Sequence, residues 1–394
     1  MALPLEGIRV ADFSHVMAGP YATHLLRLMG AEVIKIEVPN KGDAMRNYGA
    51  DRRYDGMAPA FIAVNAGKKS IALDLKDPEQ RDVARQIVSR CDVLVENFRP
   101  GVIDRLQLGY QAARELRADI IYCSISGYGQ TGPLRDWPAI DNIVQATSGM
   151  MSLGGDPGDP PMRVGFPVVD TLTGQTAAYA ILGALLRRER TGEGDYIDVA
   201  MFDASLSFMA SAVVPYLVTG KALERTGNTG YSGQPTSALF SARDGRLISL
   251  GVVQQHHFVV LASLLGRRDW LDNAIFADPE ARRANATTVQ QELGAELRKR
   301  DAAEWEKVMS AAGIPCGMVR EVSEAAEFAA QAGRECTIPV HVDGLPDRDD
   351  VQVLGRGFSA ASMPPSPIEA PPRLDEHRGE ILRWLALGAK SNAA

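Results

Sequence analysis

The sequence of 394 residues lacks the short motifs that identify several common enzyme classes. Ser14–Pro20 follows the first apolar run where a dinucleotide-binding enzyme has GxGxxG, which argues against NAD or FAD. GxxxxGK(S/T), HExxH and GxSxG are also absent, which argues against a P-loop NTPase, a zinc peptidase and an α/β-hydrolase. His256 and His257 are adjacent and point in different directions, so no metal site is indicated.

Cysteine, basic charge and long apolar runs are all scarce. The four cysteines are far apart with no CxxC, so neither a zinc site nor a disulfide framework is expected, and Cys91 and Cys123 lie in apolar runs as buried hydrophobic residues would. The 42 Lys and Arg against 49 Asp and Glu give a net charge of −7, which argues against nucleic acid or an anionic membrane as a partner. The N-terminus has no signal-peptide pattern and the apolar stretch 206–218 is too short to span a bilayer, so we expect a cytoplasmic protein.

The sequence does contain predicted strands that alternate with predicted helices, as in an α/β fold. A strand at 8–13, a helix at 21–29 and a strand at 31–36 form a βαβ unit, whose strands should be parallel. Further strands are predicted at 70–75, 92–97 and 120–125, separated by helices. The pattern predicts an open, Rossmann-like parallel sheet in a large domain, 1–220, completed by 335–394.

The second half predicts longer helices and a smaller α/β domain at 225–330. Helices are expected at 139–151, 170–188, 205–219, 255–265, 288–311 and 379–387. Strands are expected at 195–199 and in a hairpin at 240–250, whose turn is Asp244–Gly245. The Pro-rich segment 355–373 is expected to be extended.

Two features invite a functional interpretation beside a structural one. Gly127–Pro133 is a glycine-rich loop after a predicted strand, which is where open α/β sheets bind ligands, although a plain turn explains it equally well. Asp170 stands where the long helix is expected to begin, which favours a helix N-cap. A carboxylate held away from water at that place can also attack an activated acyl group.

Seven segments resemble the family III CoA-transferases and extend over nearly the whole chain. They are Ala11–Pro20, Gly30–Glu37, Asn65–Ile71, Val95–Gly101, Ser126–Pro133, Val169–Gly174 and Gly313–Gly317. The family, also called CaiB/BaiF, includes formyl-CoA:oxalate and succinyl-CoA:glutarate CoA-transferases, with α-methylacyl-CoA racemases as relatives. The resemblance implies a ring-shaped subunit in an interlocked homodimer, closed by the arm 355–373.

The resemblance also implies the catalytic and CoA-binding residues. The family's catalytic aspartate matches Asp170, which would form a covalent aspartyl-CoA intermediate. The residues expected along CoA, some of them for its phosphates, are Val16, Met17, Ala18, Leu73, Lys76, Asn97, Phe98, Arg105, Leu106, Gly127, Tyr128 and Asp141. CoA or acyl-CoA would be a co-substrate, with no metal and no permanently bound cofactor.

Ile140 separates the transferase interpretation from the racemase alternative. The racemase relatives carry an acid/base histidine at the matching position, before the residue that matches Asp141, and an isoleucine cannot take a proton from an α-carbon. A CoA transferase is therefore predicted. A racemase or epimerase acting on CoA esters, or a non-catalytic CoA-binding relative, stays open.

The acceptor is expected to be a small carboxylic acid, most simply a dicarboxylic one. Arg46 and Arg163 are candidates to bind its carboxylate, since guanidinium suits bidentate contacts, although surface or interface salt bridges explain them as well. The formyl-CoA enzyme has Gln where this chain has Met17, and a four-glycine run where this chain has only Gly227–Gln234, which argues against formate and oxalate. Candidate donors are succinyl-CoA or acetyl-CoA, and candidate acceptors are glutarate, itaconate, mesaconate, malate and oxalate.

Overall fold

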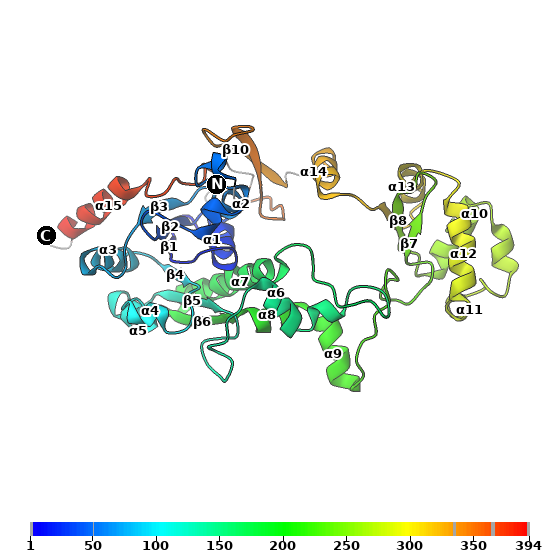
Figure 1. Cartoon of the computed structure of the whole chain (residues 1–394), viewed down its shortest axis with the longest axis horizontal. Helices are drawn as coiled ribbons and strands as arrows, with labels where there is room; N and C mark the ends of the chain where they lie inside the picture. The colour runs from blue at the N-terminus through cyan, green and yellow to red at the C-terminus, as the bar shows by residue number, and fades with distance from the viewer. Residues whose placement is uncertain (1–2, 50, 334–335, 364–366, 392–394) are drawn as a thin grey trace. The chain divides into compact units, whose positions relative to one another are not determined.

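The computed structural model describes residues 3–49, 51–333, 336–363 and 367–391 (Figure 1). The chain forms two compact units, each with its own core. The larger unit contains 1–150, 163–220 and 334–394, and the smaller contains 151–162 and 221–333. The short segment 151–162, which the sequence places in the large domain, thus groups with the smaller unit.

The larger unit is built on a six-stranded sheet whose neighbouring strands all run parallel. The strands are β1 (Arg9–Asp12), β2 (Glu32–Glu37), β3 (Lys69–Ala72), β4 (Val93–Glu96), β5 (Ile121–Ser126) and β6 (Asp195–Ala200). Their order, β3-β2-β1-β4-β5-β6, is that of a Rossmann-like sheet, as the sequence predicts. The order reverses between β1 and β4, and ligands of such sheets bind at the carboxyl ends of the strands near this switch point.

Helices cover both faces of this sheet. Helices α1 (Ala18–Leu28) and α7 (Val168–Thr191) pack on one face, where Val10 and Val93 point. Residues Ala11 and Leu94, one position further along the same strands, point to the opposite face. There they meet the remaining cover helices, α3 (Pro78–Val88), α5 (Tyr110–Leu116) and α15 (Arg378–Ser391) (Figure 1). The strands therefore carry apolar residues at successive positions, as buried parallel strands do.

Smaller elements complete the larger unit. Helix α2 (Pro59–Asn65) packs with the antiparallel hairpin β10 (Thr337–His341) and β11 (Asp350–Leu354), which the sequence analysis did not predict. Short helices lie in two connections of the sheet: η1 (Ala44–Asn47) and η2 (Arg52–Tyr54) after β2, and α4 (Val102–Arg105) after β4. The tail segment 355–373 lies only partly within the described residues, because 364–366 are outside them.

Three of the predicted helices are shortened or divided in the structure. The helix expected from residue 139 is α6 (Asp141–Thr147), followed by η3 (Met150–Ser152). The helix expected at 205–219 is two helices, α8 (Met201–Phe208) and α9 (Ala210–Thr219), bent by 79° at Met209. The helix expected at 288–311 is α12 (Ala286–Leu297) and α13 (Ala302–Ala311), because Asp301 and Glu304 form a capping box that starts a new helix.

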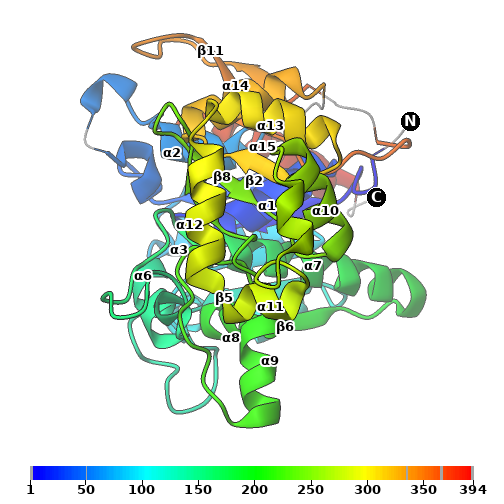
Figure 2. The same ribbon diagram turned by 90° about the vertical axis from the view of Figure 1, so that its right-hand side faces the viewer.

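The smaller unit is a three-stranded antiparallel sheet packed against helices. Its strands, in the order β7-β8-β9, are β7 (Leu239–Ser241), β8 (Leu247–Leu250) and β9 (Cys316–Met318). Its remaining helices are α10 (Gln255–Leu264), η4 (Arg268–Asp272), α11 (Pro279–Ala284) and α14 (Val322–Gln331). Helices α10, α12 and α13 lie around β8 (Figure 2). The core of this unit includes Phe258 of α10, Leu293 of α12 and Trp305 of α13. The predicted hairpin with its turn at Asp244–Gly245 is confirmed.

Within the described residues, no single helix is long and apolar enough to cross a membrane, and α8 with α9 passes that test only as a bent pair. Cys91 and Cys123 are buried, as expected, and all four cysteines are unpaired.

Candidate active site

Asp170 lies in the first turn of α7. The contacts at the C-terminus of this helix show at which edge of the sheet its first turn lies. Near the C-terminus of α7, the guanidinium of Arg188 binds Asp92 and the carbonyl of Asp119, which precede β4 and β5. The C-terminus of α7 therefore lies at the amino edge of the sheet. A helix of 24 residues is about 36 Å long, so its first turn reaches the carboxyl edge.

A close helix contact places Asp170 beside the start of α1. A Cβ atom on Gly174 would lie 2.6 Å from the carbonyl oxygen of Ala18, so only glycine allows this approach of α7 to α1. Both helices have their N-termini at the carboxyl edge and run in the same direction. Asp170, four residues before Gly174, shares its helix face. This face therefore continues, one turn earlier, toward the residues that precede Ala18.

The interpretation of Asp170 as the helix N-cap is wrong. Helix α7 begins at Val168, two residues earlier than predicted, and Asp170 is its third residue. The first turn is capped by Asp141 from α6, whose Oδ2 accepts hydrogen bonds from the backbone N–H of Val169 (2.7 Å) and of Asp170 (3.1 Å). Because another segment satisfies these donors, the Asp170 carboxylate is not needed for capping.

Gln145 extends this cap one turn along α6. Its amide nitrogen donates to Oδ1 of Asp141 at 2.6 Å, and its Oε1 accepts from the backbone N–H of Val164 at 2.9 Å. Helix α6 thus holds two points of the segment that leads into α7. Sequence reasoning missed Gln145, and the pattern Asp-x-x-x-Gln on one helix face was the available signal.

The surroundings of the Asp170 carboxylate are apolar or negatively charged rather than cationic. The carboxylate is half-buried, and among the described residues no hydrogen bond or ion pair reaches it. Burial, with the nearby negative charge of Asp141 as a second cause, raises the pKa of Asp170 to about 7. A carboxylate poorly solvated and unpaired is a stronger nucleophile than one in water, and this is the chemistry that covalent catalysis requires.

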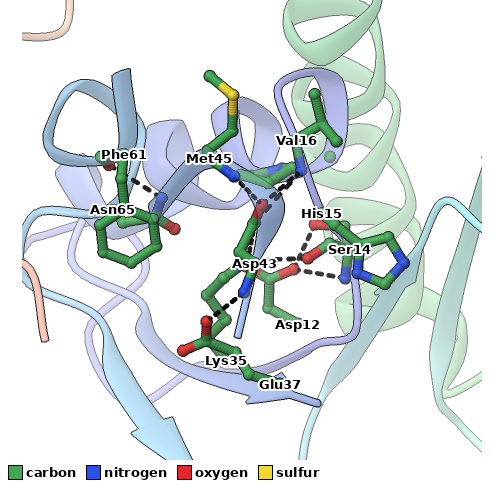
Figure 3. Close-up of polar contacts among 12 residues, drawn as sticks. Asp12, Ser14, His15, Val16, Lys35, Glu37, Asp43, Met45, Phe61 and Asn65 are labelled. Carbon is green, nitrogen blue, oxygen red and sulfur yellow. Dashed lines mark hydrogen bonds and ion pairs between the residues drawn. The ribbon is translucent and has the colours of Figure 1, made fainter. Parts of the chain in front are cut away.

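The β1–α1 connection carries three of the predicted CoA-binding residues. Val16 has a φ of +66° and is 43 % exposed, Met17 is half-buried, and Ala18 begins α1. Positive φ is rare for a β-branched residue, and such strain is typical of functional sites. Figure 3 shows this connection over a group of buried charges that includes Lys35 and Asp43.

The connections after β4 and β5 lie at the same carboxyl edge. The Asn97 amide accepts a hydrogen bond from the backbone N–H of His15 and donates one to the His15 carbonyl oxygen. The ring of Phe98 packs edge-on against the ring of His15, with 4.6 Å between the ring centroids. These contacts join the β1 and β4 connections across the switch point. Gly127 and Tyr128 follow β5, and Tyr128 donates to or accepts from the hydroxyl of Thr147 at the end of α6.

The predicted phosphate-binding cations are available. Lys76 follows β3 and Arg105 ends α4, and both are exposed. Among the described residues neither the Lys76 ammonium nor the Arg105 guanidinium has a hydrogen-bonded or ion-pair partner. The two predicted apolar neighbours differ, since Leu106 is half-buried whereas Leu73 is 1 % exposed in the core. The position of Leu73 leaves mainly its backbone for a ligand.

The two candidate substrate arginines have different surroundings. Arg46 is 3 % exposed, and its guanidinium binds Glu37 through two nitrogens and the Pro372 carbonyl through the third, while stacking 3.9 Å from the Phe61 ring. With these bonds made, Arg46 is a structural group, and we do not include it among the substrate contacts. Arg163 is exposed and, within the described part of the chain, without a partner.

Buried charges beneath the β1–α1 connection were missed by the sequence analysis. Lys68 donates to Asp12 (3.0 Å), Pro20 O and Thr23, and burial lowers the pKa of Lys68 to about 8. The signal was visible, since Lys35 stands inside the apolar strand β2. No group of three or more residues suited to a metal ion occurs among the described residues.

Comparisons with known proteins show which family this chain resembles. The sequence model of CoA-transferase family III matches residues 5–378 of this chain. An acetyl-CoA:oxalate CoA-transferase of Acetobacter aceti is 39 % identical over 356 residues, which are 87 % of this chain and 90 % of that protein. A succinate–glutarate CoA-transferase of Agrobacterium fabrum is 35 % identical, covering 97 % of this chain and 96 % of that protein.

A solved structure shows the same fold. A CaiB/BaiF family protein from Brucella suis superposes with a TM-score of 0.86 and 30 % identity, covering 98 % of this chain and all of that one.

Proposed function

The chain belongs to CoA-transferase family III, and we propose that it moves CoA from succinyl-CoA or acetyl-CoA to a small dicarboxylic acid. The observation that carries this proposal is the unpaired, half-buried Asp170 carboxylate at the carboxyl edge of the sheet. The relatives named above act on oxalate and glutarate, so both acids belong to the first panel of acceptors. Oxalate stays in that panel although the substitution at Met17 argues against it.

The proposed mechanism conserves the thioester energy. The Asp170 carboxylate attacks the thioester carbonyl of the donor, the C–S bond breaks, and a mixed anhydride and CoA thiolate form. The thiolate then attacks the aspartyl carbonyl, which gives an aspartyl-CoA thioester and releases the donor acid. The acceptor carboxylate attacks this thioester, and the released thiolate takes the acceptor acyl group from the second anhydride. Asp170 is restored as a carboxylate, and the sequence of steps needs no oxidant and no net proton.

The residues that we propose to contact CoA are those whose side chains are accessible at the carboxyl edge of the sheet. Lys76 and Arg105 offer charges that can pair with the phosphates of CoA. Val16 is exposed and Met17 half-buried, so these two residues offer surface for CoA just before α1 begins at the buried Ala18. Arg163 is the remaining candidate for the acceptor carboxylate.

A racemase remains the alternative. Ile140 precedes α6, next to the Asp141 cap of the Asp170 helix, and its exposed side chain has no group that can remove an α-proton. Two-base proton transfer therefore lacks one base at this position, which favours CoA transfer.

A homodimer is part of the proposal. Helix α9 has no buried residue, and four of its large apolar side chains are exposed: Val214, Tyr216, Leu217 and Val218. In both Figure 1 and Figure 2 this helix projects away from the sheet of its own unit. Such an apolar helix is expected to be covered by a second copy of the chain. Mixing two differently tagged preparations tests the interlocked form, since heterodimers formed within minutes, or a monomer in sedimentation, would exclude it.

The function is tested by assaying purified protein with succinyl-CoA and acetyl-CoA against a panel of carboxylic acids. We expect a new acyl-CoA with at least one dicarboxylic acid, without added metal or nucleotide. A parallel incubation of a 2-methylacyl-CoA in deuterated solvent tests the alternative. Loss of its α-proton, with no transfer to any acid, would identify a racemase instead.

A further inference from the structure

One buried ion pair holds two neighbouring points of the β1–α1 connection. Lys35 and Asp43 are both buried and lie 2.9 Å apart. The Lys35 ammonium donates to the carbonyl oxygen of Ser14 at 2.8 Å, and the Asp43 carboxylate accepts from the backbone N–H of Val16 at 3.0 Å (Figure 3). The two charged groups thus form hydrogen bonds with the backbone immediately before and immediately after His15.

A third side chain holds the residue between these points. Asn97, after β4, accepts from the backbone N–H of His15 at 2.9 Å and donates to its carbonyl oxygen at 2.7 Å. Four successive backbone groups, from the Ser14 carbonyl to the Val16 N–H, therefore each have a side-chain partner from another part of the sheet. Loops at a surface normally satisfy such groups with water or with their own turns, so this degree of fixation is unusual.

The fixed conformation is one that Val16 would not adopt by itself. A valine at a φ of +66° is sterically disfavoured, and the 43 % exposure of its side chain shows that packing in the core is not the reason for it. Strain of this kind persists only where the surroundings impose it. The surroundings here are the Asp43 and Asn97 contacts, and the strained residue lies at the carboxyl edge of the sheet, which the first turn of α7 also reaches.

The ion pair is itself held in place from below. The backbone N–H of Asp43 donates to Oε2 of Glu37 at 2.9 Å, and the same carboxylate is bound by the guanidinium of Arg46. Burial opposes both charges of the pair, but the neighbouring charges outweigh it. Lys35 lowers the pKa of Asp43, and Asp12 and Asp43 raise the pKa of Lys35. The pair is therefore a permanently charged support. A buried ion pair of this kind contributes little net stability, which leaves its geometric effect as its main consequence.

We propose that Lys35 and Asp43 are positioning residues, which hold the β1–α1 connection in its strained form before acyl-CoA binds. This keeps Val16 and the start of α1 in place beside Asp170, so that binding needs no ordering of the connection. The inference rests on the proposed function, because it assumes that acyl-CoA lies at this edge.

The first test replaces both charges at once, Lys35→Met with Asp43→Leu. Removing the two partners together avoids an uncompensated buried charge, so the protein should fold, but the Ser14 carbonyl and the Val16 N–H lose their partners. We expect the KM for acyl-CoA and the dissociation constant of CoA to rise about tenfold or more, while kcat at saturation falls less. The matched control is Arg117→Met, which removes an ion pair with Asp92 at the amino edge of the same sheet and should leave KM unchanged.

A KM and a CoA affinity within twofold of the wild-type values, in a folded double variant, would overturn the inference. So would an equal rise in the Arg117→Met control, because the effect would then be a general one. Neither result touches the proposed function, which fails instead if the wild-type protein binds no CoA and transfers none.

A second measurement uses only the wild-type protein and holds even if the double variant does not fold. Hydrogen–deuterium exchange of the peptide that contains Ser14–Val16 should be slow without ligand and should change little when CoA is added. Rapid exchange in the free protein, with protection appearing only on addition of CoA, would show that the connection is ordered by the ligand and would overturn the inference.

Discussion

Two groups of carboxylates lie at the carboxyl edge of the same sheet in opposite electrostatic surroundings. On the β1 side, Asp12 and Asp43 are buried against Lys68 and Lys35, and although burial opposes their charge, these cations hold their pKa values below the usual range. On the α7 side, burial and the neighbouring carboxylate of Asp141 raise the pKa of Asp170 to about 7. The same residue type is thus a fixed structural anion at one place and the proposed nucleophile at the other, according to whether a cation accompanies its burial.

The largest expected effect comes from removing the unpaired carboxylate. Asp170→Ala should lower turnover at least about a thousandfold, since the change removes the proposed nucleophile. CoA should still bind, because the proposed contacts lie on other segments and Asp141, rather than Asp170, caps α7. Steady-state rates and calorimetric CoA titration measure the two properties, and Glu189→Ala, an exposed acid at the far end of α7, is the control.

Chemical labelling makes this prediction sharper. Hydroxylamine or borohydride treatment of wild-type protein with acyl-CoA should modify the peptide that contains Asp170. A variant with more than a few per cent of wild-type turnover, together with an unlabelled peptide, would show that Asp170 is not the nucleophile.

The next effect tests the paired side of the comparison. Lys68→Met leaves the fully buried Asp12 without its ion-pair partner, and breaking a buried pair in this way costs about 3–5 kcal/mol of unfolding free energy. Urea denaturation measures it. Lys76→Met, which removes an exposed ammonium, should leave the unfolding free energy unchanged. Equal unfolding free energies of the two variants would contradict this prediction. The hydrogen bonds from Ser14 and Thr23 would then be enough to keep Asp12 buried without Lys68.

A smaller effect follows from the pH dependence of stability. Because the pKa of Asp170 is raised to about 7 in the folded protein, its contribution to stability is present below its ordinary pKa near 3.8 and is lost as pH rises through 7. Asp170→Asn should therefore be more stable than wild type by about 1–2 kcal/mol at pH 8, with a smaller difference at pH 5. Unfolding curves at both pH values measure it. The matched control is Asp203→Asn on α8, which replaces an exposed acid.

The smallest effect concerns the charge of Asp141. Asp170 must be ionised to react, so the rate should fall as pH decreases below 7. Asp141→Asn keeps the size of the capping side chain but removes the neighbouring negative charge, and should move this acid limb down by up to about one pH unit. The pH profile of kcat/KM measures the shift. An unmoved limb with a lower maximal rate would assign to Asp141 only the capping role.

Much of the fold was predictable because the relevant signals are local. Apolar runs of strand length alternate with helical segments from Arg9 to Ser126, and this alone gives the parallel sheet. The missed boundaries have identifiable causes. The two-residue error at Val168 arose because Asp170 has the composition of a cap while the actual cap, Asp141, lies 29 residues away in sequence. The break at Met209 carries no Gly or Pro, whereas Pro215 lies inside α9.

The sequence by itself determined the order of the elements and the family to which the chain belongs, and through the family resemblance it singled out Asp170 as the candidate nucleophile. Only the tertiary structure decided how each charged group is used. Arg46 and Arg163 are the same residue type, yet the guanidinium of Arg46 is bound by Glu37, whereas Arg163 is exposed and has no partner among the described residues. The physical reason is that pairing and desolvation depend on which side chains from distant segments come within a few ångströms of one another, and these two quantities decide whether a charge supports the fold or reacts.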